Sequence, residues 1–72
     1  LSSEASSVVT AAIAELPLQY RAPLVLREIE GLSYREIAEA LDCREGTVKS
    51  RISRAKARLR EQLADYWHGE KE

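Results

Sequence analysis

Six basic side chains lie close together in the second half of this 72-residue chain. The stretch from Gly46 to Arg60 contains no aspartate or glutamate, and its basic members are Lys49, Arg51, Arg54, Lys56, Arg58 and Arg60. Dense local positive charge attracts a polyanion even where the total charge is small, because salt screens each charge beyond about 8 Å. This stretch is therefore the first candidate for contact with nucleic acid.

The charge of the whole chain gives the opposite indication. Its net charge is −1 and its pI is near 5.9, whereas a pI above about 9 is usual for a nucleic-acid-binding domain. The total conceals a division: residues 1–30 carry −2, residues 31–64 carry +3 and residues 65–72 carry −2. The local positive charge of the basic stretch therefore indicates more about nucleic-acid binding than the net charge of the whole chain does.

The basic stretch has the periodicity of a helix with two distinct faces. At about 100° per residue, one apolar seam forms, and small side chains occupy the opposite side. The seam comprises Val48, Ile52, Ala55, Leu59 and Leu63, and the small side chains are Gly46, Ser50, Ser53 and Ala57. Basic rows flank the small side chains, with Lys49, Lys56 and Arg60 on one edge and Arg51, Arg54 and Arg58 on the other. A DNA major groove about 12 Å wide admits such a helix, with the cations reaching the phosphates.

The residues before the basic helix predict a helix-turn-helix. Ser33 and Glu36 form a capping box at the start of a short helix, and the turn at residues 42–44 follows it. Ala38 is small where the two helices must approach, and Asp42 occupies the turn position that favours a residue tolerant of positive φ. A plain helical hairpin with a solvated cationic face is the alternative at this point.

The remaining elements complete an all-α, four-helix domain that occupies the whole chain, residues 1–72. We predict helices over about 3–16, 18–30, 33–41 and 45–66, with a frayed tail at 67–72. Pro17 separates the first two helices and Gly31 ends the second. Pro23 is awkward inside a helix, so the regular part of the second helix is expected to begin near it. The absence of methionine and the start at Leu1 suggest a domain excised from a longer protein.

Catalytic, metal and membrane interpretations find little support. His68 is the only histidine and Cys43 the only cysteine, so no internal disulfide and no Cys/His metal site can form, and no cofactor is expected. No serine has a fixed base beside it, so no enzyme activity is expected. No apolar run approaches the roughly 18 residues of a membrane span, and a reducing, cytoplasmic location fits the single cysteine.

Two strings are more specific than a bare helix-turn-helix: GLSYREIA at residues 31–38 and GTVKSR at residues 46–51. Together with Leu16-Pro17, residues 27–30 and Arg54-Ala55-Lys56, they make the chain from about Val9 to Leu63 resemble region 4 of the extracytoplasmic-function sigma factors of bacterial RNA polymerase. The resemblance implies recognition of the promoter −35 element by the fourth helix. It further implies attachment to polymerase through the flap of its β subunit and, in many relatives, occlusion by an anti-sigma factor.

The resemblance also assigns roles to individual residues. The base-reading positions of the family fall on Lys49, Ser50, Ser53 and Arg54. The expected phosphate or flanking contacts are Arg35, Thr47, Arg51, Lys56 and Arg58. Relatives often prefer an AAC-containing −35 element. Ser53 is small where some relatives have a bulky residue, which affects base preference.

Two alternatives of other classes remain at this point. LuxR-type response regulators share a GLS…EIA…TVK pattern, but they usually continue with a histidine and a shorter last helix. A helical protein-interaction module would use its basic face to bind an acidic partner without contacting DNA. The first two helices also carry more apolar residues than one core-facing stripe needs, so some are expected to be exposed as a docking surface for a polymerase or anti-sigma helix. Leu18, Leu26 and Val9 are the candidates for exposure.

Overall fold

The computed structural model describes the backbone of residues 3–71 and the side chains of residues 7–65. Within that range the chain forms four helices and no strand: α1 (Ser3–Ala14), α2 (Leu18–Glu28), α3 (Tyr34–Leu41) and α4 (Glu45–Lys71). The predicted all-α fold is confirmed.

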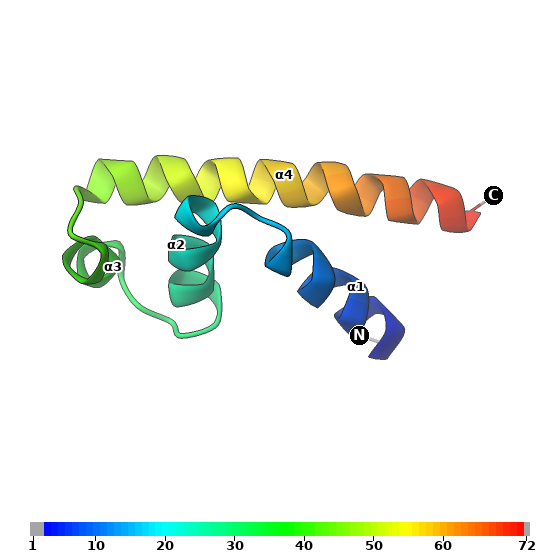
Figure 1. Ribbon diagram of the computed structural model, residues 1–72, viewed down its shortest axis with the longest axis horizontal. Coiled ribbons are helices and arrows are strands. Elements are labelled where there is room, and N and C mark those ends of the chain that lie inside the picture. The colour runs from blue at the N-terminus through cyan, green and yellow to red at the C-terminus, as the bar shows by residue number, and fades with distance from the viewer. Residues whose placement is uncertain (1–2, 72) are drawn as a thin grey trace.

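Helix α4 determines the shape of the molecule, which measures 44 × 20 × 15 Å along its principal axes. Figure 1 shows α4 along the full length of the longest axis, with α2 and α3 beneath its N-terminal half. Helix α1 slants away from α4 toward the other end. The most extensive packing is between α2 and α4, followed by α3 against α4. Packing against α2 and α3 therefore fixes the position of the first half of α4.

The core lies where α2 and α3 meet the first half of α4. Three residues of the predicted seam, Val48, Ile52 and Ala55, are almost completely buried, while Leu59 and Leu63 are half-buried. The core cluster consists of Leu16, Tyr20, Leu24, Ile37, Ala38, Val48, Ile52 and Ala55. Ala38 is 7% exposed, in agreement with the need for a small side chain between the two helices.

The sequence predicted that the regular part of the second helix begins near Pro23, and this prediction is wrong. The helix begins at Leu18, directly after Pro17, and continues through Pro23, whose ring is fully buried. Proline lacks the N–H that would bond to the carbonyl group of Gln19, four residues earlier. Gln19 is exposed near the helix start, so water can satisfy that carbonyl group, and burial of the ring offsets the lost hydrogen bond.

The helix ends differ from the predicted ranges by a few residues. Helix α1 ends at Ala14, because a residue before proline, here Leu16, is disfavoured in the helical region. Helix α2 ends at Glu28, and the chain leaves it through Gly31 at φ +74°. Helix α4 continues to Lys71, past the predicted end near Tyr66, and the stretch between them contains no proline that would break it. The predicted tail at 67–71 is thus helical, and Glu72 lies outside the described residues.

Candidate nucleic-acid interface

Helix α3 starts at a complete capping box. The Glu36 backbone N–H donates to the Ser33 hydroxyl at 3.1 Å, and the Ser33 backbone N–H donates to Glu36 Oε1 at 2.8 Å. The Ser33 backbone N–H, and secondly its hydroxyl, hydrogen-bond the Glu36 carboxylate and hold its pKa below the usual value. These bonds satisfy donors at the helix start, and they place Tyr34 and Arg35 in its first turn.

The turn between α3 and α4 has the geometry expected of a helix-turn-helix. Asp42 adopts the left-handed conformation, with φ 54° and ψ 54°. Its N–H donates to the carbonyl groups of Ala38 and Glu39, and the Cys43 N–H donates to the Ala38 carbonyl at 2.9 Å. This is the Schellman arrangement, which ends a helix and reverses its direction. The predicted tolerance of positive φ at Asp42 is confirmed.

Helix α4 begins immediately after this turn. The Arg44 carbonyl accepts the first helical bond from the Val48 N–H at 3.1 Å, so Arg44 stands at the N-cap position. Burial of Val48 and Ile52 against α3 and α2 turns the opposite side of the helix outward. The orientation of the outward face is therefore set by core packing and by the turn.

All four predicted base-reading residues are on this outward face. Lys49, Ser50, Ser53 and Arg54 are each exposed, and they lie within two turns of one another. The Ser50 hydroxyl donates to the Thr47 carbonyl at 3.2 Å, and no carboxylate within residues 7–65 pairs with Arg54. Side chains that are exposed, adjacent and able to donate hydrogen bonds meet the geometric requirement for reading base edges. Their role in reading bases stays a prediction.

The five predicted phosphate contacts are less uniform. Arg35, Lys56 and Arg58 are exposed, whereas Thr47 and Arg51 are half-buried. Arg51 lines a groove that α2 and Leu41 form with it, at the N-terminal end of α2. Arg35 projects from α3 rather than α4, so the set spans both helices of the helix-turn-helix. Phosphate contacts from two helices would fix the register of the domain on a duplex.

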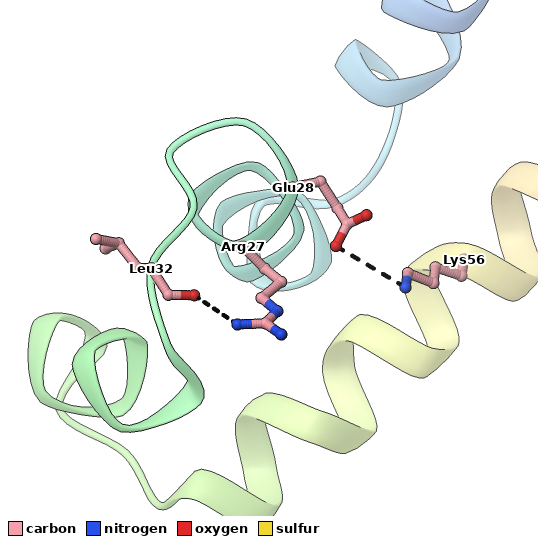
Figure 2. A network of polar contacts seen from close by, with 4 residues as sticks. All are labelled: Arg27, Glu28, Leu32 and Lys56. Carbon is pink, nitrogen blue, oxygen red and sulfur yellow. Dashed lines mark hydrogen bonds and ion pairs between the residues drawn. The ribbon is translucent and has the colours of Figure 1, made fainter.

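Two basic side chains of α4 contact residues of α2, and the sequence did not indicate these contacts. Lys56 Nζ lies 3.9 Å from Glu28 Oε2, as Figure 2 shows. Arg58 lies over the ring of Tyr20, with its Cζ atom 4.9 Å from the centroid. The side chains of Lys56 and Glu28 are 47% and 50% exposed, so their ion pair contributes about 1 kcal/mol or less. Such a weak pair leaves Lys56 able to exchange its partner for a phosphate.

The loop after α2 is tied back to that helix by an arginine. Arg27 Nη1 donates to the Leu32 carbonyl at 2.9 Å, an arrangement visible in Figure 2. The same guanidinium lies over the ring of Tyr34, 4.5 Å from its centroid. Tyr34 is half-buried at the edge of the core rather than within it, and the Lys49 ammonium lies 5.5 Å from the same centroid.

Some apolar side chains of the region predicted as the first two helices are exposed, as expected, and they lie at the two ends of α2. Leu18 and Ile29 are each 66% exposed, whereas Val9 and Leu26, the other two candidates, are half-buried. An apolar groove of about 220 Å³ lies between the first two helices and α4. It is lined by Ile13, Leu24, Val25, Glu28, Ile29, Lys56 and Leu59. The Glu28–Lys56 pair therefore forms the polar rim of this groove.

The described part of the chain contains neither a candidate metal-binding cluster nor a membrane-spanning helix. Among its residues, no three His, Cys, Asp or Glu side chains come close enough to hold a metal ion. None of its helices combines the length and the apolar character that crossing a bilayer requires.

The short capped helix, the left-handed turn and the exposed basic helix define a helix-turn-helix domain. A family model described as "Sigma-70, region 4" matches residues 6–59, and the chain belongs to that family. This membership confirms the resemblance seen in the sequence, and it decides against the LuxR-type alternative.

Curated relatives support the same membership. The "ECF RNA polymerase sigma-E factor" of Haemophilus influenzae is 46% identical over 63 residues, which cover 88% of this chain and 33% of the relative. Proteins of the same name from Salmonella typhi and Escherichia coli are 50% identical over 56 residues, covering 78% of this chain and 29% of theirs. The chain thus spans about a third of the length of the relatives that it matches.

Proposed function

We propose that this domain recognises the −35 element of promoters as part of an extracytoplasmic-function sigma factor, and so directs transcription initiation. One observation carries the proposal: Lys49, Ser50, Ser53 and Arg54 lie together on the exposed side of α4, in a stretch without acidic residues. Membership of the region 4 family and the names of the relatives support it. The role is binding rather than catalysis, and it implies a cytoplasmic location.

In the proposed complex, the first half of α4 lies in the major groove. Arginine and lysine donate to guanine O6 and N7, and serine hydroxyls contact several bases. Lys49, Ser50, Ser53 and Arg54 take this part, which gives the domain its base preference. The contacts to phosphates, which supply affinity without reading sequence, fall to Arg35, Thr47, Arg51, Lys56 and Arg58.

The experiment that tests this function is selection of bound duplexes from a random pool, followed by titration at several salt concentrations. If about four cations reach phosphates, log K falls against log salt with a slope of roughly −3 to −4. Affinity then drops by about two orders of magnitude between roughly 50 and 200 mM salt. An AAC-containing consensus is the expected result of the selection.

A binding constant independent of salt, or a pool that yields no consensus, contradicts DNA recognition. The same titration separates the proposal from the rival interpretation, a protein-interaction module. Such a module would bind an acidic peptide through its basic face, and it would show no preference among duplexes of equal length.

The exposed side chains Leu18 and Ile29 at the two ends of α2, with the apolar grooves beside this helix, are proposed to bind polymerase or an anti-sigma factor. An amphipathic helix, such as one from the β flap, binds by placing its apolar side in a groove of this kind. We expect Leu18→Glu to weaken binding of the chain to the purified β flap while the base preference of DNA binding is kept. Leu18 is 66% exposed, so the fold should tolerate the charge, and the groove that it lines with Arg51 contains none of the four base-reading residues. Equal flap binding by the variant and the parent would place the docking surface elsewhere.

A further inference from the structure

Lys49 differs from the other predicted base-reading residues in having an aromatic partner within the described residues. Its Nζ atom lies over the ring of Tyr34, 5.5 Å from the centroid. A cation within about 6 Å of a ring centroid is attracted by the ring, and the attraction amounts to about 0.5 to 1 kcal/mol at an exposed site. The contact joins the first turn of α3 to the second turn of α4.

The position of the Tyr34 ring is itself fixed by residues that precede α3 in the chain. Arg27 lies over the same ring at 4.5 Å, and its guanidinium is fixed by the hydrogen bond to the Leu32 carbonyl at 2.9 Å. The capping box at Ser33 fixes the backbone immediately before Tyr34. Tyr34 is half-buried against the core, whereas Lys49 is exposed. A well-fixed ring therefore supports a flexible side chain.

We propose that Tyr34 is a positioning residue that directs Lys49 toward one base pair in the groove. The inference rests on the proposed function. A lysine side chain has many rotamers and three freely rotating donors, so alone it binds phosphates and bases without much discrimination. A ring that restricts the ammonium before DNA arrives lowers the entropy lost on binding. It also keeps the ammonium on one side of the helix.

This proposal makes different predictions from two simpler roles of Tyr34. If the ring only packed against the core, its loss would lower stability but would leave base preference unchanged in the folded fraction. If the hydroxyl bound a phosphate, its removal would weaken binding to every duplex about equally, and it would leave the salt slope unchanged because a neutral donor releases no counterion. Positioning of Lys49 instead predicts loss of discrimination at a single base pair.

The test compares Tyr34→Leu, Tyr34→Phe and a control, Glu15→Gln, which alters an exposed side chain between α1 and α2, outside the helix-turn-helix. Each 72-residue variant is titrated with the selected duplex and with duplexes that carry one changed base pair. We expect Tyr34→Leu to lose about two- to five-fold discrimination at one position, the equivalent of the cation–ring attraction. Tyr34→Phe keeps the ring and should match the parent and the control.

A double-mutant cycle identifies Lys49 as the residue through which Tyr34 acts. In a Lys49→Ala background, Tyr34→Leu should cause no further loss of discrimination. An additive loss in that background, or unchanged discrimination in Tyr34→Leu, overturns the proposal. Equal losses in Tyr34→Phe and Tyr34→Leu on every duplex overturn it in favour of a phosphate contact.

A measurement without DNA separates failure of this proposal from failure of the proposed function. A ring current shifts protons above a ring upfield, so the ε-methylene NMR signal of Lys49 should lie upfield of that of Lys56 in the free parent. Lys56 is a suitable reference because its partner is a carboxylate. An unshifted Lys49 signal overturns the positioning role, even if Tyr34→Leu does not fold. A shifted signal in a chain that binds no duplex means that DNA recognition has failed, and the positioning role with it, although the contact exists.

Discussion

The two faces of the first half of α4 differ greatly in solvent exposure, although residues of both faces are neighbours along the chain. Val48 and Ala55 have no measurable exposure and Ile52 has 3%. Lys49 and Arg54, next to them in sequence, are exposed. The inward face is fixed by packing against α2 and α3, whereas the outward face has few internal partners. Stability and the proposed DNA recognition therefore depend on different residues of one helix, so each can be changed separately.

The largest expected effect comes from the inward face. Ile52→Ala removes buried methylene groups, and we expect it to lower the free energy of unfolding by about 2 to 5 kcal/mol. A loss of this size is a large share of the stability of a domain so small, because a single core in a chain of about 70 residues rarely supplies more than roughly 3 to 5 kcal/mol. Urea denaturation followed by circular dichroism measures the change. A midpoint equal to that of the parent would mean that the inward face is wrongly assigned.

The outward face should show the reverse behaviour. Arg54→Ala and Lys49→Ala should lower the melting temperature far less than Ile52→Ala, because neither side chain is part of the core cluster and Lys49 loses only its contact with the Tyr34 ring. Each should remove about 1 to 3 kcal/mol of discrimination between the selected site and a duplex with one changed base pair. Calorimetry and competition binding measure the two quantities on the same samples. A large drop in melting temperature would show that the faces are not independent.

A smaller effect on stability is expected at the turn between α3 and α4. A β-branched side chain in the left-handed conformation costs about 1 to 2 kcal/mol, so Asp42→Val should lower the stability by about that amount. Asp42→Gly is the matched control, since glycine adopts positive φ without strain. Equal stabilities of the two variants would contradict the importance of backbone strain at this position. Thermal melting monitored by circular dichroism distinguishes them.

The smallest expected effect concerns pH and the capping box of α3. The pKa of Glu36 is lowered in the folded chain, so the unfolded chain binds its proton at a higher pH. The stabilisation is therefore fully present above the unfolded value of 4.5 and is lost as the pH falls through the lower folded value. The melting temperature of the parent should exceed that of Glu36→Gln near neutral pH.

The difference between these two melting temperatures should narrow as the pH falls below 4.5 and the carboxyl becomes protonated. Because the amide introduced by Glu36→Gln keeps a side-chain acceptor for the Ser33 N–H, the comparison isolates the charge. A difference that is constant over this pH range would contradict the link between the pKa of Glu36 and the stability of the cap.

Local signals in the sequence predicted the parts of the fold that depend on neighbouring residues. The capping box at Ser33, the positive φ at Asp42 and the buried seam through Ile52 each require only helix periodicity or the conformational preference of one residue. The structure confirms all three. The exposed positions of Ser50 and Arg54 follow from the same periodicity.

Contacts between helices could not be predicted in this way. The pairs Lys56–Glu28 and Arg58–Tyr20 depend on the angle at which α2 crosses α4, and no periodic pattern specifies that angle. The continuity of α2 through Pro23 also depends on tertiary packing, because burial of the ring offsets the lost backbone bond. The support that Tyr34 gives Lys49 belongs to the same group, since it joins two elements across a turn.

The short connections between the helices have a consequence for how fast the chain folds. Residues 15–17, 29–33 and 42–44 are the only segments between the four helices of the described chain, so consecutive helices can meet after closing very small loops. Helical domains with such local connections fold in times on the order of microseconds to milliseconds. A chain that opens briefly should therefore close again within the same short time, so the open form is exposed to proteases only briefly.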